Sequence, residues 1–375
     1  MKYIKFFLVV IILFINCARI KINSEVFEKI SIPNWKMYGG NPARTNFYPG
    51  TISLPLKLTW KYDASSAIGK TIIVIDSLVY FTTMDGRLYA LDIKTGEKIG
   101  HKKINVHAAC AYQDNSIVIA YRYGDNTLFK YNLKRAKYDW KIDAGDITSE
   151  PLLLENSIVI TALYNHVDLY NATDGSRIWQ IKIEDQIRSS PAFHQGIIVF
   201  GCDDGLLYAV DKLYGEILWK YKTNASVEAT PAIKDTIVYI GSSDKNFYAI
   251  NIKTGKLIWS FKTGGQIFHS PAVNDSVVTL GTTDSQLYCL DRFSGKKIWS
   301  FEAKSVISTS PLISNNKVFF GSLDHHYYAV DLTSGKEIWK FKTKGRVKTA
   351  PVIWGNYLIG ASENNHVYAF STAEE

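Results

Sequence analysis

Six residues that could bind a ligand or a partner share one position relative to prolines that recur every 40 residues. Each stands three residues before its proline, and the set is Thr148, Arg188, Glu228, Phe268, Ser308 and Lys348. Arg188 and Lys348 could together contact a small anionic ligand. If these positions instead form a solvated rim of the folded repeats, Arg188 and Glu228 would make an exposed ion pair between neighbouring repeats. Such a pair contributes little stability. The mixed composition of the set favours the solvated rim and leaves the anionic ligand as the alternative.

No stretch of the sequence matches a catalytic motif. We find no nucleophile elbow, no phosphate-binding loop and no zinc signature. His325 and His326 are adjacent at the start of a predicted strand, so their side chains point to opposite faces and do not bind one metal together. Four aspartates that recur with the same period are predicted to be turn residues; they are Asp204, Asp244, Asp284 and Asp324. The sequence therefore predicts no catalytic residue, no metal site and no cofactor.

The elements that must position these residues belong to an internal repeat. A unit Tyr-Ala-x-Asp, followed by a glycine and a tryptophan, recurs every 40 residues over much of the chain. A fixed period of this length indicates a solenoid, a propeller or another array. The repeat tryptophans are Trp60, Trp140, Trp179, Trp219, Trp259, Trp299 and Trp339, and Gly100 takes the same position in one period. We expect each tryptophan to pack between neighbouring units as a structural residue.

Each period contains four strand-like runs. In one period the runs are residues 227–233, 236–241, 246–251 and 256–261, separated by turn residues. Four antiparallel strands with tight turns form one blade of a β-propeller. The periods predict eight blades, at residues 67–104, 107–142, 147–182, 187–222, 227–262, 267–302, 307–342 and from 347 onward. The last blade is one strand short, so the alternating run 56–62 is predicted to close the ring and remove an open sheet edge.

The composition is typical of an all-β protein with a large core. Hydrophobic residues make up 46% of the chain and aromatic residues 13%, and aromatic and β-branched residues favour strands. The formal net charge of +8 comes without a run of five or six basic residues, which disfavours nucleic-acid binding. Cys110, Cys202 and Cys289 fall in different blades, so we expect buried free thiols rather than disulfides.

The N-terminus has the pattern of a targeting segment. Lys2 and Lys5 precede an apolar stretch at residues 6–15, which is too short to cross a bilayer and has the length of a secretory signal core. The stretch ends at Cys17, which resembles the lipid-modified cysteine of a bacterial lipoprotein; plain cleavage and an uncleaved anchor are the alternatives. We predict a signal peptide at 1–17, a tether at 18–34 and the propeller at 35–375.

The repeat Ala-x-Asp-x-x-Thr-Gly-x-x-x-Trp resembles that of quinoprotein-type (PQQ-like) propellers, and the segment from Trp35 to Trp60 resembles their opening. One branch of this superfamily is the quinoprotein dehydrogenases, which hold pyrroloquinoline quinone and calcium in the central funnel. Many carry an adjacent Cys-Cys pair, and this sequence has neither that pair nor a Cys-x-x-Cys-His motif for haem attachment. The chain is more similar to a second branch, the lipid-anchored eight-bladed propellers of outer-membrane protein assembly.

The second resemblance implies a non-enzymatic scaffold, anchored by lipid at Cys17 to the periplasmic side of the outer membrane. Such a chain would act as a monomeric propeller within the barrel-assembly machinery. The resemblance places the partner contact on the rim, at Gln186, Ile187, Arg188, Ser226 and Glu228. The alternative is a quinoprotein-like enzyme or a small-ligand sensor, with Arg188, Glu228, Phe268 and Lys348 in the central funnel.

Overall fold

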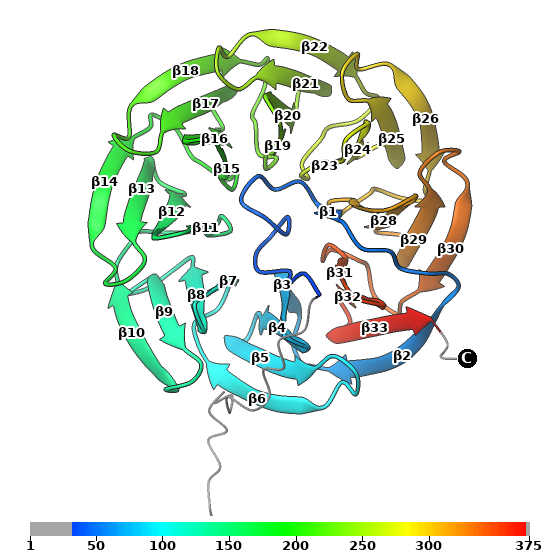
Figure 1. The fold of residues 1–375 in the computed structure, drawn as a ribbon, viewed down its shortest axis with the longest axis horizontal. Helices are drawn as coiled ribbons and strands as arrows, with labels where there is room; N and C mark the ends of the chain where they lie inside the picture. Colours follow the sequence, from blue (N-terminus) through cyan, green and yellow to red (C-terminus); the bar gives the residue numbers. More distant parts are fainter. Residues whose placement is uncertain (1–31, 373–375) are drawn as a thin grey trace, which may run out of the picture.

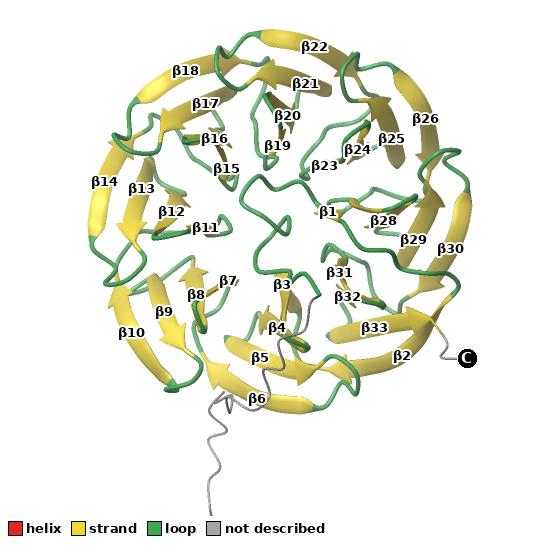
Figure 2. Ribbon diagram, in the orientation of Figure 1, coloured by secondary structure: helices red, strands yellow, loops and turns green. Residues whose placement is uncertain are grey.

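The computed structural model describes residues 32–372, which form a closed ring of eight β-sheets (Figure 1). The predicted signal peptide, Cys17 and most of the predicted tether lie outside the described residues. Strands and loops build the ring (Figure 2), and among residues 32–372 no helix has the length and hydropathy needed to cross a lipid bilayer. The prediction of an all-β, eight-bladed propeller is confirmed.

Each blade is an antiparallel meander that runs from the centre of the ring outward (Figure 1). Blades 1 and 2 consist of β3 (Ile68–Ile75), β4 (Leu78–Thr83), β5 (Arg87–Asp92) and β6 (Lys98–Lys103), then β7 (Ala108–Gln113), β8 (Ser116–Tyr121), β9 (Leu128–Asn132) and β10 (Lys137–Ile142). Blades 3 and 4 consist of β11 (Leu152–Leu154), β12 (Ser157–Ala162), β13 (His166–Asn171) and β14 (Arg177–Lys182), then β15 (Ala192–His194), β16 (Ile197–Gly201), β17 (Leu206–Asp211) and β18 (Ile217–Lys222).

The remaining blades repeat the same order. Blades 5 and 6 consist of β19 (Ala232–Lys234), β20 (Ile237–Gly241), β21 (Asn246–Asn251) and β22 (Leu257–Lys262), then β23 (Ala272–Val273), β24 (Val277–Gly281), β25 (Gln286–Asp291) and β26 (Lys297–Glu302). Blade 7 consists of β27 (Leu312–Ser314), β28 (Lys317–Gly321), β29 (His326–Asp331) and β30 (Glu337–Lys342), and blade 8 begins with β31 (Val352–Trp354), β32 (Tyr357–Ser362) and β33 (His366–Thr372).

The ring is closed by a strand from the start of the described chain. β2 (Leu56–Asp63) pairs antiparallel with β33 and becomes the outer strand of blade 8, with Trp60 opposite Ala369. The predicted closure by the N-terminal strand is therefore confirmed. The short strand β1 (Phe47–Tyr48) adds to blade 7, where it pairs parallel with β27. Strands from both halves of the sequence thus meet in blade 8, and every blade has a full set of four strands.

The innermost strands are shorter than predicted. In blade 5 the run 227–233 was expected as a strand, but β19 covers only Ala232–Lys234. The preceding residues leave the sheet because their backbone groups bond to neighbouring blades: the N–H of Val227 donates to Cys202 O (3.0 Å), and Ser189 Oγ donates to Ala229 O (2.7 Å). The residues before each proline therefore lie on loops at the rim of the ring.

Each repeat tryptophan joins its blade to the next one. Trp259 Nε1 donates to Arg292 O (3.1 Å), and the indole lies against Gly295, where an added Cβ would sit 2.6 Å from the ring. The same bond to the next blade is made by Trp60, Trp140, Trp179, Trp219, Trp299 and Trp339. Where Gly100 replaces the tryptophan, Ala136 replaces the glycine, with a φ of 52°. At the junction between blades 1 and 2, the tryptophan and the glycine that would contact each other are thus both replaced.

The recurring aspartates hold the turn between the second and third strands. Asp244 Oδ1 accepts the N–H of Asn246 (2.8 Å), and its Oδ2 accepts the hydroxyl of the repeat residue Tyr248 (2.6 Å). The equivalent tyrosine bonds link Tyr208 to Asp204 and Tyr328 to Asp324. Their carboxylates are therefore occupied within the blade.

The described cysteines are free and buried. Burial raises the pKa of Cys202 to about 12, and it also raises the pKa of the Cys110 and Cys289 thiols. Because the thiolate is the reactive form, these side chains behave as small apolar core residues.

Candidate functional site

Residues 35–48, hereafter the plug, cross the centre of the ring (Figure 1). The plug has no regular secondary structure apart from β1 and one bridge of Trp35 to Val74. It bonds to inner strands of several blades: the carbonyls of Pro42, Ala43, Thr45 and Asn46 accept the N–H groups of Phe193, Ile233, Val273 and Ile313. Those four donors belong to blades 4, 5, 6 and 7, so the plug is tied to consecutive blades around the channel.

Arg44 fixes the plug through backbone carbonyls of two further loops. Its side chain is fully buried; Nε donates to Pro191 O (3.0 Å), and Nη2 donates to Pro151 O (3.1 Å) and Glu150 O (3.3 Å). Nη1 donates to Tyr38 O within the plug (2.5 Å). Burial lowers the pKa of Arg44 to about 10, opposed by the nearby Glu150, so the side chain stays charged at neutral pH. Four of its five N–H donors thus bond to backbone carbonyls and serve the structure.

Titratable groups surround Arg44 at the centre of the ring. Burial raises the pKa of Glu150, and the Oε2 atom of this carboxyl has no hydrogen-bond partner among the described residues. Tyr38 and Ser310 share a hydroxyl–hydroxyl bond of 2.6 Å. Burial and the charge of Lys70 lower the pKa of His269 to about 4, so this imidazole is neutral at pH 7. The channel interior is therefore polar but tightly packed.

The cavity beside the plug is too small for pyrroloquinoline quinone with calcium. The cavity between the plug, Lys70 and Pro351 has a volume of about 10 Å³, which is room for about one water molecule. Within residues 32–372 no group of three His, Cys, Asp or Glu side chains is arranged to hold a metal ion. Arg44, the buried cation of the channel, is occupied by four carbonyl groups.

The rim joins blades 4 and 5 through an ion-pair cluster. Arg188 Nη1 lies 3.3 Å from Asp203 Oδ2 and 3.6 Å from Glu228 Oε1, and Nη2 donates to Gln186 Oε1 (3.2 Å). Arg188 precedes β15, Asp203 follows β16, and Glu228 precedes β19. The Arg188 side chain remains 48% exposed, so the cluster faces solvent. We call Gln186, Arg188, Asp203, Ser226 and Glu228 the blade 4–5 rim.

The blade 4–5 rim carries more acid than base. Desolvation raises the pKa of Asp203; Arg188 opposes this shift, and the charges of Glu228, Asp185 and Asp204 add to it. Two carboxyl groups thus pair with one guanidinium, and the charges of two more act on Asp203, in a chain whose formal net charge is +8. Ser226 Oγ bonds to Glu228 Oε1 (3.3 Å) and to Ser243 Oγ (3.0 Å), which orders the blade 5 side of the cluster. The surface therefore suits a basic partner.

Ile187, predicted as a partner contact, is a core residue. It has no exposed surface and packs among the buried residues between blades 3 and 4, including Ile198 and Phe200. In an extended segment successive side chains point to opposite sides. Since Arg188 faces solvent, its neighbour Ile187 must face the core, and the assignment of Ile187 to the surface is corrected.

The structure does not bring Arg188 and Lys348 together. Lys348 belongs to blade 8, four blades from Arg188 in a ring of eight, and its Nζ lies 2.6 Å from Glu363 Oε1 of the same blade. Arg346 pairs with the same carboxylate. Phe268, on the blade 6 loop, is half-buried. The predicted funnel residues are therefore distributed around the rim, and the two cations are already paired with acids.

Sequence reasoning missed the roles of the plug and of Arg44. Two glycines mark the segment: a Cβ on Gly39 would lie 2.8 Å from Arg44 Cα, and one on Gly40 would lie 2.9 Å from the Trp35 ring. Both glycines have positive φ, at 73° and 80°. Paired glycines beside a tryptophan and an arginine, in a segment without strand alternation, were the signal of a tightly packed irregular element.

Many solved structures share this fold, and three of them illustrate it. BamB from Moraxella catarrhalis is 16% identical, with 85% of this chain and 100% of that chain covered and a TM-score of 0.72. A computationally designed protein, Ika8, is 19% identical over 85% of this chain and 100% of its own, with a TM-score of 0.75. A europium-containing methanol dehydrogenase is 13% identical over 93% of this chain and 100% of its own, with a TM-score of 0.79. Identities this low establish the fold alone.

The sequence comparisons are more specific for part of the chain. No curated protein matches the sequence. The family described as "Beta-alanine-activating enzyme, beta-propeller" matches residues 155–372, which is more than half of the chain. The match covers blades 4 to 6, most of blade 3, the four meander strands of blade 7, and blade 8 without its outer strand β2. The resemblance to PQQ-like repeat propellers is confirmed by this match and by the structural neighbours. The chain therefore belongs to the β-propeller family described as "Beta-alanine-activating enzyme, beta-propeller".

Proposed function

We propose that this chain is a non-enzymatic scaffold of the bacterial cell envelope that supports the assembly of outer-membrane β-barrel proteins. The observation that carries the proposal is the plug, which crosses the channel, is hydrogen-bonded to inner strands around it and borders a cavity of only about 10 Å³. A partner must then bind the rim or the outer surface. The similarity in fold to BamB supports a role of this class.

The blade 4–5 rim is the proposed contact with the partner. It is formed by loops on a rigid ring, an arrangement that suits recognition because the scaffold fixes the loop ends. Its surplus of carboxylates fits a basic segment of the periplasmic part of a barrel-assembly protein, and complementary charge would speed the encounter. Gln186 and Ser226 add neutral hydrogen-bonding groups beside the charged cluster.

The proposed location is the periplasmic side of the outer membrane, with the chain held by lipid at Cys17. The chain would act there as a monomeric propeller within a larger complex. This part of the proposal rests on the N-terminal sequence pattern, because Cys17 lies outside the described residues.

Photocrosslinking in intact membranes tests the scaffold role. A photoreactive residue at Gln186 or Ser226 should capture a barrel-assembly protein, whereas the same residue at Lys253, on an exposed outer turn of blade 5, should not. Capture from Lys253 and not from the rim would reject the proposed surface. Recovery of only unrelated proteins from all three positions would reject the assembly role.

A quinoprotein-like enzyme is the competing function, suggested by the similarity in fold to the methanol dehydrogenase. Purified chain would be incubated with pyrroloquinoline quinone and calcium and assayed for dye-linked oxidation of alcohols. We expect no stoichiometric uptake, since the channel centre is filled by the plug. Uptake at one quinone per chain together with oxidation would overturn the scaffold proposal.

A further inference from the structure

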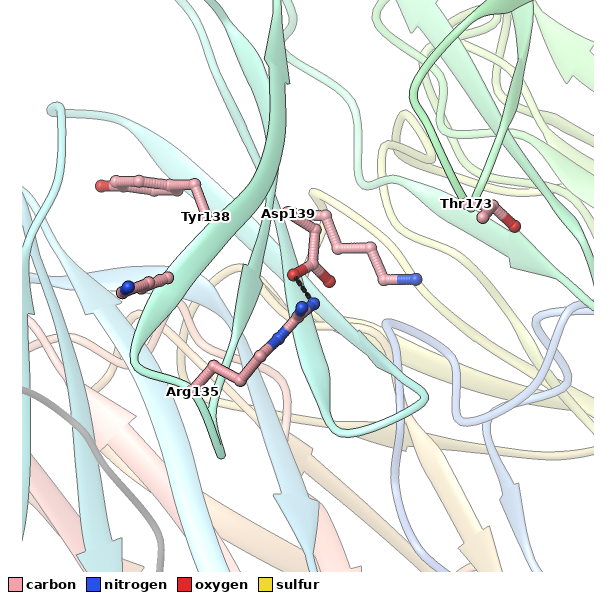
Figure 3. Close-up of a pocket in the computed structure, with 6 residues that line it drawn as sticks. Arg135, Tyr138, Asp139 and Thr173 are labelled. Atoms are coloured by element: carbon pink, nitrogen blue, oxygen red, sulfur yellow. Dashed lines mark hydrogen bonds and ion pairs between the residues drawn. The ribbon is translucent and has the colours of Figure 1, made fainter.

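A basic pocket opens between blades 2 and 3, away from the channel and the blade 4–5 rim. It has a volume of about 390 Å³ and is lined by Lys130, Arg135, Lys137, Tyr138, Asp139 and Thr173. Figure 3 shows Arg135 bonded to Asp139 on one side and Thr173 approaching from the neighbouring blade. Three of the lining residues are cations and one is an acid, so the lining has a positive formal charge.

The buried cation of this pocket stands where the other blades have an uncharged residue. Lys130 pairs across the sheet with Trp140. In the other seven blades the residue at this register position is uncharged: Ala90, Leu169, Ala209, Ala249, Cys289, Ala329 or Ala369. Lys130 is only 7% exposed. A buried ammonium is costly unless it is paired, so its presence at a position that accepts alanine calls for a partner.

The protein itself supplies that partner only in part. Lys130 Nζ donates to Ala172 O (3.0 Å), a neutral carbonyl that also accepts the Trp140 Nε1–H (3.2 Å). An ammonium has three N–H donors, and no carboxylate of the described residues lies within ion-pair distance of Lys130 Nζ. Asp139, the acid of the lining, is bonded to Arg135 at 2.5 Å. Lys130 therefore keeps donor capacity directed into a cavity.

The turn beside the pocket has also changed. The other repeat turns end in Thr-Gly, Ser-Gly or a related pair, whereas this one reads Lys134-Arg135-Ala136-Lys137. The backbone N–H of Arg135 donates to Asn132 Oδ1 (2.9 Å), which fixes the turn and places its cations beside Lys130. Thr173 adds a hydroxyl from the turn of blade 3. The unusual residue at the core position, Lys130, and the unusual turn at residues 134–137 thus border the same pocket.

From this juxtaposition we infer that the pocket between blades 2 and 3 binds an oxyanion of the phosphate class. Lys130 contributes a desolvated charge, Arg135 and Lys137 contribute charge at the opening, and Thr173 contributes a hydroxyl donor. Charge-assisted hydrogen bonds of this kind are stronger than neutral ones. A soluble phosphate ester and a phospholipid headgroup present the same chemistry, and both fit this description of the ligand.

Titration calorimetry on the purified full chain tests the site, with inorganic phosphate as the probe and sodium chloride at equal ionic strength as the reference. Lys130→Ala installs the residue found at this position in five other blades, so it should fold, and it should weaken phosphate binding at least about tenfold. Lys137→Gln should weaken binding severalfold. Its matched control is Lys256→Gln, at the same repeat position in blade 5, which should leave binding unchanged.

Asp139→Asn provides a test of opposite sign, because it removes the acid of the lining and releases Arg135; it should strengthen phosphate binding. A second experiment distinguishes a soluble ligand from a lipid headgroup. It measures co-sedimentation of wild type and Lys130→Ala with phosphatidylglycerol vesicles and with phosphatidylcholine vesicles. A Lys130-dependent preference for phosphatidylglycerol vesicles would assign the site to a headgroup. Lys130-dependent binding of inorganic phosphate without that preference would assign it to a soluble ligand. Equal behaviour of wild type and Lys130→Ala in both experiments would overturn the inference.

Discussion

Trp259 of blade 5 and Gly295 of blade 6 are packed so closely that a β-carbon on the glycine would lie 2.6 Å from the indole ring. Trp259→Ala should lower the free energy of unfolding by about 3–5 kcal/mol, since it leaves a cavity between the blades. Gly295→Ala should cost about 1–3 kcal/mol through the clash and through its φ of +69°.

Ala136 offers the matched control, because it occupies the same position at the junction where Gly100 replaces the tryptophan. Ala136→Gly should change stability by less than about 1 kcal/mol. Chemical denaturation of the three variants measures these effects. A cost for Ala136→Gly as large as that of Gly295→Ala would contradict the junction described above.

Arg44 should be the most sensitive residue of the plug. Arg44→Met keeps an apolar stem but removes a buried charge that bonds to carbonyls of three segments, so it should destabilise the chain by about 3–5 kcal/mol. Arg44→Lys should recover only part of this loss, because an ammonium cannot reproduce the planar fork of the guanidinium. Hydrogen exchange of the Phe193 and Ile233 amides, which bond to the plug, should rise in both variants. Unchanged protection of these amides would show that the plug does not depend on Arg44.

His269 should make stability depend on pH between about 6.5 and 4. Its folded pKa is lowered to about 4 from an ordinary 6.5, by burial first and by Lys70 second. In this window the unfolded chain binds the proton and the folded chain does not, so stability falls as pH falls from 6.5 to 4. His269→Gln should lose less stability over the window than wild type, while the two chains should keep a constant difference above pH 7. Parallel pH curves for both chains would exclude His269 as the source.

Charge reversal at the rim should separate binding from folding. Arg188→Glu replaces the exposed cation of an acidic cluster by a carboxylate. Because the ion pairs of Arg188 are exposed, the free energy of unfolding should change by less than about 1 kcal/mol. Crosslinking of a basic partner at Gln186 should increase or persist. The double substitution Asp203→Lys and Glu228→Lys should abolish crosslinking by reversing the local field. Retention of full crosslinking in the double variant would show that charge does not select the partner.

Cys17→Ser should move the chain from the membrane fraction to the soluble fraction of cell lysates, because a single thiol is the proposed attachment point for lipid. Fractionation with immunodetection measures this change, and Cys110→Ser is the control because Cys110 is buried in the ring. Membrane retention of the Cys17→Ser chain would defeat the anchor.

The repeat made the fold predictable, whereas the structure of the residues outside the repeat could not be predicted from the sequence. Tryptophans at a fixed spacing define the register of every blade, and the strand around Trp60 follows from the missing strand of blade 8. The plug has no period, and several of its bonds run to backbone groups more than 100 residues away, which side-chain patterns do not encode.

The candidate site was predictable only by position. The register correctly placed Arg188 and Glu228 at equivalent positions of adjacent blades, but it put Glu228 inside a strand that begins only at Ala232. It also did not reveal side-chain direction, which is why Ile187 was expected among the contact residues of the rim. The role of Asp203 was missed because the residue belongs to a different loop from Arg188 and meets it only in the folded blade. The pocket at Lys130 requires two blades to be assembled, since Thr173 comes from the second.

The pairing of β2 with β33 also sets an order of events during synthesis. Thr59 and Ser371 bond across this sheet although 312 residues separate them, so the segment that leads the ring must wait for the segment that ends it. Until then blade 8 is one strand short and its backbone edge stays open to pairing with other chains. Loop-closure entropy opposes so distant a contact, and folding should therefore be slow at this step. The state of this protein that most needs protection by a chaperone is therefore the nearly complete chain, before β2 has paired with β33.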